Sequence, residues 1–599
     1  MEPEPEVKFG TTRVVKCALE PLCKDTGLLE RLRERAAQID RLVTETYHLM
    51  HLDLRVRYEK AGGGLVTEPP WTKDRVMEFM QAVTTCQQQS GPERLHALRR
   101  QHYDPLRTTG LESRAGLPYS SLIECATKIA ASIETNVRQH FAQHQRRYLK
   151  LRDGLLTNKE ADERQSSINA QAAKDRAADL TCRDNSLPHF LGENTVGEDL
   201  QQHPERYLFV LWRYNIAFEE AGQHTVAVLP LSTGFVPGSS LHIDTQALET
   251  LVGKKDERAR PYFAALDARR EADREVGKKR RPPGRNDSVE ALDEKDLLWS
   301  AFFNLDHVVS PSKVRKCRFG HHLTTDGISV SVTVLRPGKE DEQKKKKAKG
   351  KKSAPTNAKK KYAKKANIDT SHLNPSKVVG VDPGKIELVH MPNDTGKRQP
   401  GAEPAKTLRY TKNQRRHESG AAKREAHQRR IRTPEVEEAE QLLSDPINHS
   451  RAPFLAAFTQ YLRNRFSVQG VLYGHYAANP IHRIFRWNNW RGRRSSEDRF
   501  VQRAVDTFGS DAVLAYGDAS GWHSMPGIEA TPTTGLKRRL AARFEVVATS
   551  EHRTSITCSN CFGYVDGDPT RTRLIIDRKD GSEKRVPVRL FIIYYYCLF

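Results

Sequence analysis

The sequence predicts a multidomain α+β protein in which a helical N-terminal lobe is followed by a small β domain and by an α/β domain with a partial zinc ribbon. Three observations predict this class. Apolar residues recur at helical spacing through the first 200 residues, strand-like runs dominate residues 201–335, and apolar strands alternate with helical segments after residue 376. A chain of 599 residues is too long for one hydrophobic core, so we expect about three to four domains.

Residues 1–200 are expected to form a mainly helical lobe. From Leu28 to Lys60 the apolar residues recur every three or four positions with charged residues elsewhere, which indicates one long amphipathic helix. Three more helices are expected at 75–87, 92–102 and 120–153. Core packing is the expected role of their apolar faces.

Residues 201–335 are expected to form a wedge-like β domain with a charged insertion at 254–295. The runs LFVLWRYNIAF and HTVAVLPL, between Tyr207 and Ile243, are rich in the β-branched and aromatic residues typical of strands. The segment from Ser329 to Leu335 resumes this pattern.

Residues 336–375 are expected to form a lysine-rich linker. Twelve lysines and no acidic residues fall between Lys344 and Lys365, and removing their charges from the formal +23 still leaves +11. The folded parts are therefore basic as well, which favours nucleic acid as the partner. The lysine run, together with the segment from Gly277 to Pro282, fits nuclear import signals and predicts a nuclear protein. A disordered basic linker is the alternative for the same run.

Several other protein classes lack support. Nine cysteines, an odd number scattered along the chain, do not form a disulfide framework and indicate a reducing compartment. The N-terminus lacks the apolar core of a signal peptide, and the apolar stretch from Leu590 to Phe599 is about half of the ~20 residues that span a bilayer. No P-loop, dinucleotide fingerprint or Ser-His-Asp order is evident. We therefore expect no membrane association and no small-molecule cofactor.

Residues 376–555 are expected to form the α/β domain. The apolar run Val378 to Val381 delivers Asp382 into the turn Pro383-Gly384, and strand patterns follow at 385–393 and 407–411 before a basic helix begins near Gln414. Three strands followed by helices, with an aspartate after the first, is the opening order of an RNase H-like domain. An ordinary Asp-Pro-Gly turn is the alternative for the tripeptide alone.

Two further strands are expected at 511–518 and 544–549, separated by a helical segment at 535–543. A helix between two strands indicates parallel neighbours in one sheet, which would bring Asp382, Asp518 and Glu551 to the same edge. Clustered carboxylates suit a two-metal Mg²⁺ site for phosphodiester hydrolysis, with its ions about 4 Å apart.

Residues 556–599 are expected to hold a partial zinc ribbon of the type that contacts target nucleic acid, and an atypical C-terminus. Cys558 and Cys561 form a C-x-x-C pair that supplies two of the four ligands of a closed Zn²⁺ site. The later Cys597 stands alone. Half a zinc site and two ordinary thiols both remain open.

Basic and aromatic residues of two helical segments are candidates for nucleic-acid contacts. In the segment 482–494, aromatic residues interleave with arginines, a composition that can stack on bases and contact phosphates. Packing of the aromatic residues against the sheet is the alternative. The candidates are Arg415, Arg416, Arg486, Trp487, Trp490 and Arg491.

The ordered series VVGVDPG, LRYTKNQRRHESG, AYGDAS, TPTTGLKRRL and EHRTSITCSNC resembles the Fanzor proteins, eukaryotic relatives of the transposon-encoded TnpB nucleases and of compact type V CRISPR effectors. These motifs cover roughly residues 377–561, and the segment 324–331 resembles the strand that precedes the nuclease domain in that family. The resemblance implies an RNA-guided DNA endonuclease with a split RuvC domain, a zinc ribbon, a guide RNA and a target DNA. It also implies that the helical region 1–200 is of the recognition type and contacts the guide–target heteroduplex through its shape and backbone. Asp382 would match the first catalytic aspartate, Asp518 would replace the usual second-motif glutamate, and Glu551 would match the relocated glutamate of the Fanzor branch.

One departure from the family pattern affects the expected activity. A second C-x-x-C and an R-D-x-N segment with the third catalytic carboxylate do not follow Cys561 in this sequence. We therefore expect a truncated or alternatively spliced C-terminus and poor cleavage by this form. The late acids, expected to form turns of a polar hairpin-like stretch, are Asp566, Asp568, Asp577 and Asp580. A catalytically impaired RNA- and DNA-binding protein is the competing interpretation, and a DNA-strand transferase, the weaker one, lacks evident motifs.

Overall fold

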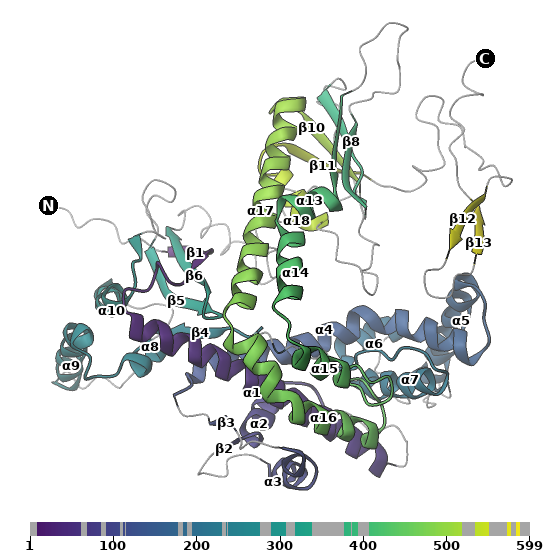
Figure 1. Cartoon of the computed structure of the whole chain (residues 1–599), viewed down its shortest axis with the longest axis horizontal. Helices are drawn as coiled ribbons and strands as arrows, with labels where there is room; N and C mark the ends of the chain where they lie inside the picture. Colours follow the sequence, from purple (N-terminus) through teal and green to yellow (C-terminus); the bar gives the residue numbers. More distant parts are fainter. Residues whose placement is uncertain are drawn as a thin grey trace, which may run out of the picture. The chain divides into compact units, whose positions relative to one another are not determined.

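The computed structural model of the chain is mixed α+β (Figure 1). It contains two compact units, one of Met1–Ala348 with Ile431–Phe485 and one of Lys349–Arg430 with Arg486–Phe599. The structure describes residues 9–61, 69–85, 92–107, 112–113, 116–177, 184–188, 195–229, 235, 238–275, 289–306, 318–337, 377–384, 386–392, 406–517, 533–549, 572–576 and 583–587.

The helices predicted in the first 200 residues are confirmed. Helix α1 (Thr26–Lys60) begins at Asp25, whose carboxylate accepts from the Leu28 amide and satisfies one of the free N–H groups of the first turn. It is followed by α2 (Lys73–Ala82), α3 (Glu93–Leu98) and α4 (Tyr119–Arg152). The other helices of the unit are α5 (Asn158–Ala177), α6 (Val196–Gln202), α7 (Leu208–Glu220), α8 (Thr245–Val252), α9 (Arg260–Glu275), α10 (Val289–Phe302), α15 (Pro434–Leu443) and α16 (Leu455–Tyr473).

An antiparallel sheet of four strands belongs to the same unit, in the order β1-β6-β5-β4. Its strands are β1 (Phe9–Ala18), β4 (Leu241–Asp244), β5 (Arg318–Thr325) and β6 (Ser329–Pro337). The strand predicted at Ser329 is confirmed, and β5 alternates between half-buried and buried residues, as a strand with one face on a core does. Short strands β2 (Thr84–Thr85) and β3 (Glu112–Ser113) pair separately.

The strand prediction for LFVLWRYNIAF was wrong, because these residues form helix α7. Most of the helix is buried, on more than one face: Leu208, Phe209, Val210, Leu211, Trp212, Tyr214, Asn215 and Phe218. A helix buried on most sides shows no 3.6-residue alternation, so its sequence resembles that of a buried strand. The described part of the next run, residues 224–229, is not a strand either. The charged insertion contains α9 and the beginning of α10.

The second unit contains the strands predicted for the α/β domain. Strands β7 (Val378–Val381), β10 (Val513–Gly517) and β11 (Glu545–Thr549) are parallel and lie in the order β11-β10-β7, which confirms the predicted neighbours. Strands β8 (Glu387–Pro392) and β9 (Thr407–Thr411) form an antiparallel pair. A backbone bridge between Asp382 and His390 joins β7 to β8, so the strands follow one another as β9-β8-β7-β10-β11.

Four helices accompany this sheet: α13 (Lys412–Glu418), α14 (Ala421–Arg430), α17 (Ile481–Phe508) and α18 (Thr533–Leu540). The core contains Phe500 and Ala504 of α17 and Leu536 of α18 together with Leu514 and the other buried residues of the strands. Burial of each large apolar side chain contributes about 1.5–3 kcal/mol. The helices predicted at 414 and 535–543 are confirmed, and residues 572–587 include the antiparallel pair β12 (Thr572–Ile576) and β13 (Glu583–Pro587).

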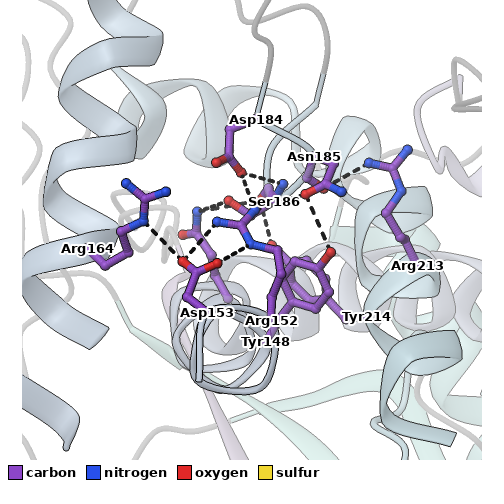
Figure 2. A network of polar contacts seen from close by, with 10 residues as sticks. Tyr148, Arg152, Asp153, Arg164, Asp184, Asn185, Ser186, Arg213 and Tyr214 are labelled. Carbon is purple, nitrogen blue, oxygen red and sulfur yellow. Dashed lines mark hydrogen bonds and ion pairs between the residues drawn. The ribbon is translucent and has the colours of Figure 1, made fainter. Parts of the chain in front are cut away.

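A polar network joins the C-terminal end of α4 to α5 and to the segment 184–188 (Figure 2). Arg152 donates to both carboxylate oxygens of Asp153, at 2.7 and 3.1 Å, and to Asp184 Oδ1 at 2.9 Å. Arg164 of α5 donates to Asp153 at 3.0 Å. The hydrogen bond from Arg152 lowers the pKa of Asp153. Burial alone would raise the pKa of Asp184, but hydrogen bonds from Arg152 and Ser186 bring it below its ordinary value.

We expect Arg152→Ala to lower the free energy of unfolding by about 1–2 kcal/mol at pH 7, because two carboxylates lose a charged donor. The pKa values of Asp153 and Asp184 in the folded protein lie below the ordinary ~3.9 of aspartate. The network therefore contributes its full stabilisation of the fold above about pH 4, and this contribution is lost as the pH falls through the folded pKa values. Thermal melting from pH 7 to pH 3 measures this effect. Wild type should lose more stability on acidification than Arg152→Ala. Arg146→Ala, which removes a more exposed pair with Asp162, is the matched control.

Candidate functional site

Asp382 follows β7 directly and is exposed at the carboxyl end of that strand. Its backbone N–H donates to His390 O at 2.9 Å, and its carbonyl accepts from His390 N at 3.0 Å. The turn that follows is tight, since a Cβ on Gly384 would lie 2.3 Å from the Glu387 carbonyl oxygen. The main chain therefore holds Asp382 at a defined point of the sheet edge, and only glycine fits the turn at position 384.

The parallel strands align the carboxyl ends that the sequence predicted to meet. Val381, Tyr516 and Ala548 lie opposite one another across β7, β10 and β11. Asp382 is the residue after Val381. Asp518 comes two residues after Tyr516 and Glu551 three residues after Ala548, and both lie outside the described residues. The predicted strand neighbours are confirmed, and the shared carboxylate cluster stays a prediction.

Of the residues expected to hold metal, only Asp382 is described, since Cys558 and Cys561 also lie outside the described residues. Among the described residues, no group of three or more His, Cys, Asp or Glu side chains is arranged to hold an ion. The Asp382 carboxylate offers hard oxygen donors, and no described side chain or amide bonds to it. Asp382 by itself therefore fits a ligand of Mg²⁺.

His390 is a neighbour of Asp382 that sequence reasoning missed. Residues that exchange both backbone hydrogen bonds across an antiparallel pair carry their side chains on the same face of the sheet. His390 Nε2 is buried and has no hydrogen-bond partner among the described residues. The pairing register identifies this neighbour, and no spacing in the sequence indicates it.

Helix α13 is attached to α17 by a buried carboxylate. Glu497 of α17 accepts from Arg415 of α13 at 2.8 Å and from Arg539 of α18 at 2.8 Å, and the Glu497 and Arg415 side chains are 10% and 12% exposed. The two helices come so close that a Cβ on Gly492 would lie 2.3 Å from the Ser419 carbonyl oxygen. Arg415, a candidate for nucleic-acid contacts, therefore holds helices together in this fold.

A second carboxylate reinforces the same junction. Glu418 accepts from Ser496 Oγ at 2.6 Å and from Gln414 Nε2 at 2.7 Å. Burial alone would raise the pKa of Glu418, but these hydrogen bonds and the charges of Arg503 and Arg499 bring it below its ordinary value. Glu418 is therefore held in the charged form at neutral pH.

The other candidates for nucleic-acid contacts lie at the surface. Arg416 is exposed and pairs with Glu425, and Arg486 and Arg491 are exposed on α17. The rings of Trp487 and Trp490 are half-buried and stack on each other at 5.1 Å with 13° between their planes. Neither tryptophan is among the buried core residues of this unit that the structure describes, and both interpretations of the segment stay predictions.

An open hollow of about 570 Å³ follows the tryptophan pair along α17. Arg494, the last residue of the segment 482–494 but not one of the named candidates, places its guanidinium 5.5 Å from the centre of the Trp490 ring. Its position one helical turn after Trp490 is the signal that identifies it. The lining residues are Trp490, Arg491, Arg494, Ser495, Asp498, Arg499 and Gln502.

Positive charge predominates on the helices beside this hollow. Residues 412–430, which include α13 and α14, carry seven Lys or Arg and two acids, and residues 486–508 of α17 carry six and three. Figure 1 shows α14 alongside α17, and Arg424 of α14 donates to Asn489 of α17 at 3.1 Å. These helices form a basic surface of the second unit.

None of the helices in the described ranges combines the length and the apolar character that crossing a bilayer requires. No protein-family model matches the chain, and a search of curated proteins found no similar sequence.

Proposed function

We propose that this protein is an RNA-guided DNA endonuclease of transposon origin, similar to the Fanzor proteins, that hydrolyses phosphodiester bonds at a RuvC-type site. The strand order β9-β8-β7-β10-β11, with Asp382 at the carboxyl end of its middle strand, is the observation that carries the proposal. The order is antiparallel from β9 to β7 and parallel from β7 to β11, as in an RNase H-like sheet. An aspartate at this point of the sheet supports a nuclease more than an ordinary turn.

Asp382 and Glu551 would hold Mg²⁺, with Asp518 as an outer or alternative ligand. When bound, two Mg²⁺ ions supply an activated water and stabilise the leaving oxygen of the phosphodiester. The chain contributes a carboxylate whose backbone is held by His390 and by the Gly384 turn, so that its oxygens keep a defined position. Cys558 and Cys561 would contribute to a structural Zn²⁺ site beside Glu551.

A guide RNA and a target DNA are the proposed partners. Support comes from the charge of +23 and from the basic helices beside α17. In RNA-guided nucleases the target DNA sequence is recognised by base pairing with the guide RNA, while the protein contacts the backbone of the heteroduplex. A nuclear location is proposed from the lysine-rich run.

Purification from cells that express the protein with its own locus tests this function. We expect a bound RNA at low salt. We also expect nucleic-acid affinity to fall steeply with salt. The slope of log K against the logarithm of the salt concentration should be about −0.9 per phosphate contact. The purified complex should cut a duplex that matches its RNA only weakly when Mg²⁺ is present, because no R-D-x-N segment with the third catalytic carboxylate follows Cys561. Protein that is free of RNA under these conditions would contradict an RNA-guided role.

The second candidate function is guided binding without cleavage. The basic surface on α13, α14 and α17 favours it, because binding at that surface does not require the proposed metal ligands Asp382, Asp518 and Glu551. The same complex would then bind the matched duplex and leave it intact. Separate binding and cleavage assays distinguish the two functions.

A further inference from the structure

The hollow on α17 combines a flat aromatic face with cations. Trp490, whose ring stacks on Trp487, provides the face, and the Arg494 guanidinium lies 5.5 Å from the Trp490 ring centre. The described residues that line this hollow all belong to α17.

The charged groups of the hollow differ in what they contact. Asp498 pairs with Arg539 of α18, and Arg499 contacts Glu418 of α13 at 3.5 Å, so each of these two contacts a neighbouring helix. Arg491 is exposed and has no ion pair within the described part of the chain. The cations that can meet an external anion are therefore Arg491 and Arg494.

We propose that this hollow binds an unpaired stretch of nucleic acid, with a base stacked at Trp490 and neighbouring phosphates on Arg491 and Arg494. An aromatic face takes up the face of a base, which neighbouring base pairs cover in a duplex and which an unpaired strand exposes. Arginines next to the ring supply the charge that the backbone requires. The inference rests on the proposed function and deepens it by naming the form of nucleic acid at this surface.

Unpaired RNA and unpaired DNA share this chemistry, and the assay separates them. Protein stripped of nucleic acid at high salt is titrated into fluorescein-labelled 12-nucleotide oligo(U), oligo(dT) and a 12-base-pair duplex, with anisotropy as the readout. We expect Trp490→Ala to weaken single-strand binding about tenfold and duplex binding less than about twofold. Trp490→Phe should restore most of the affinity, because a planar ring remains. A larger loss for oligo(U) would assign the hollow to RNA, and a larger loss for oligo(dT) to DNA.

Two further variants complete the design. Arg491→Ala and Arg494→Ala should each reduce the salt slope by about one phosphate contact. Gln441→Ala replaces an exposed, uncharged side chain of α15 that does not line the hollow, and it is the control for which we expect wild-type affinity. Melting curves confirm that the variants fold.

Equal losses for single strands and duplex in Trp490→Ala, or no loss at all, would overturn the inference. Guide-directed cleavage by wild type would then still support the proposed nuclease. Conversely, Trp490-dependent binding of single strands by a protein that never cuts would retain the inference and reject the endonuclease.

Discussion

Asp382→Ala is expected to eliminate the weak Mg²⁺-dependent cleavage of a guide-matched duplex while the affinity for that duplex stays at the wild-type level. Removing the carboxylate deletes an oxygen donor at the edge where the ion would bind. Even partners that only orient metal ligands affect activity by about 10–100-fold, so losing a ligand should cost at least a hundredfold. Single-turnover cleavage of a labelled duplex measures the rate, and anisotropy measures the binding.

Asp511→Ala is the matched control for this experiment. Asp511 is an exposed aspartate of the same unit, but it precedes β10 at the opposite end of the strands and pairs with Lys377. Its replacement should leave cleavage unchanged. Equal rates for Asp382→Ala and wild type would contradict the assignment of Asp382, and equal losses in both variants would indicate a general effect on the sheet.

The largest effect on stability is expected for Glu497→Ala. Its carboxylate, 10% exposed, joins Arg415 of α13 and Arg539 of α18 to α17, and its removal leaves both guanidinium groups without this partner. Breaking a buried ion pair from one side costs about 3–5 kcal/mol. Urea denaturation, with hydrogen exchange at the α13 and α17 amides, measures the local and the global loss.

Glu425→Ala provides the comparison for that measurement. Glu425 pairs with Arg416 in the same unit, and both side chains are about half exposed, at 48% and 49%. A solvent-exposed ion pair contributes about 0–1 kcal/mol to the free energy of unfolding, so the stability of this variant should remain close to that of wild type. Similar losses for the two variants would mean that the contacts of Glu497 contribute no more than a surface pair.

The sequence by itself determined the elements whose signal is local. The apolar spacing of residues 28–60 predicted α1, and the apolar runs at 378, 513 and 544 predicted β7, β10 and β11 as parallel neighbours. A helix with one buried face and a strand bounded by turn residues carry their periodicity within a few residues. The position of Asp382 at the end of β7 could be predicted for the same reason, because the strand and the Asp-Pro-Gly turn are adjacent in the chain.

Only the tertiary structure decided the features that depend on partners distant in the sequence. Helix α7 was predicted as a strand because burial on most of its surface removes the helical period from its sequence. Strand β1 pairs with β6, which begins at Ser329, more than 300 residues later in the chain. Arg415 became part of the α13–α17 junction because the fold places Glu497 beside it, 82 residues later in the chain. His390 lies opposite Asp382 through the pairing register. These contacts arise from packing between elements, and the local sequence does not predict which elements will pack together.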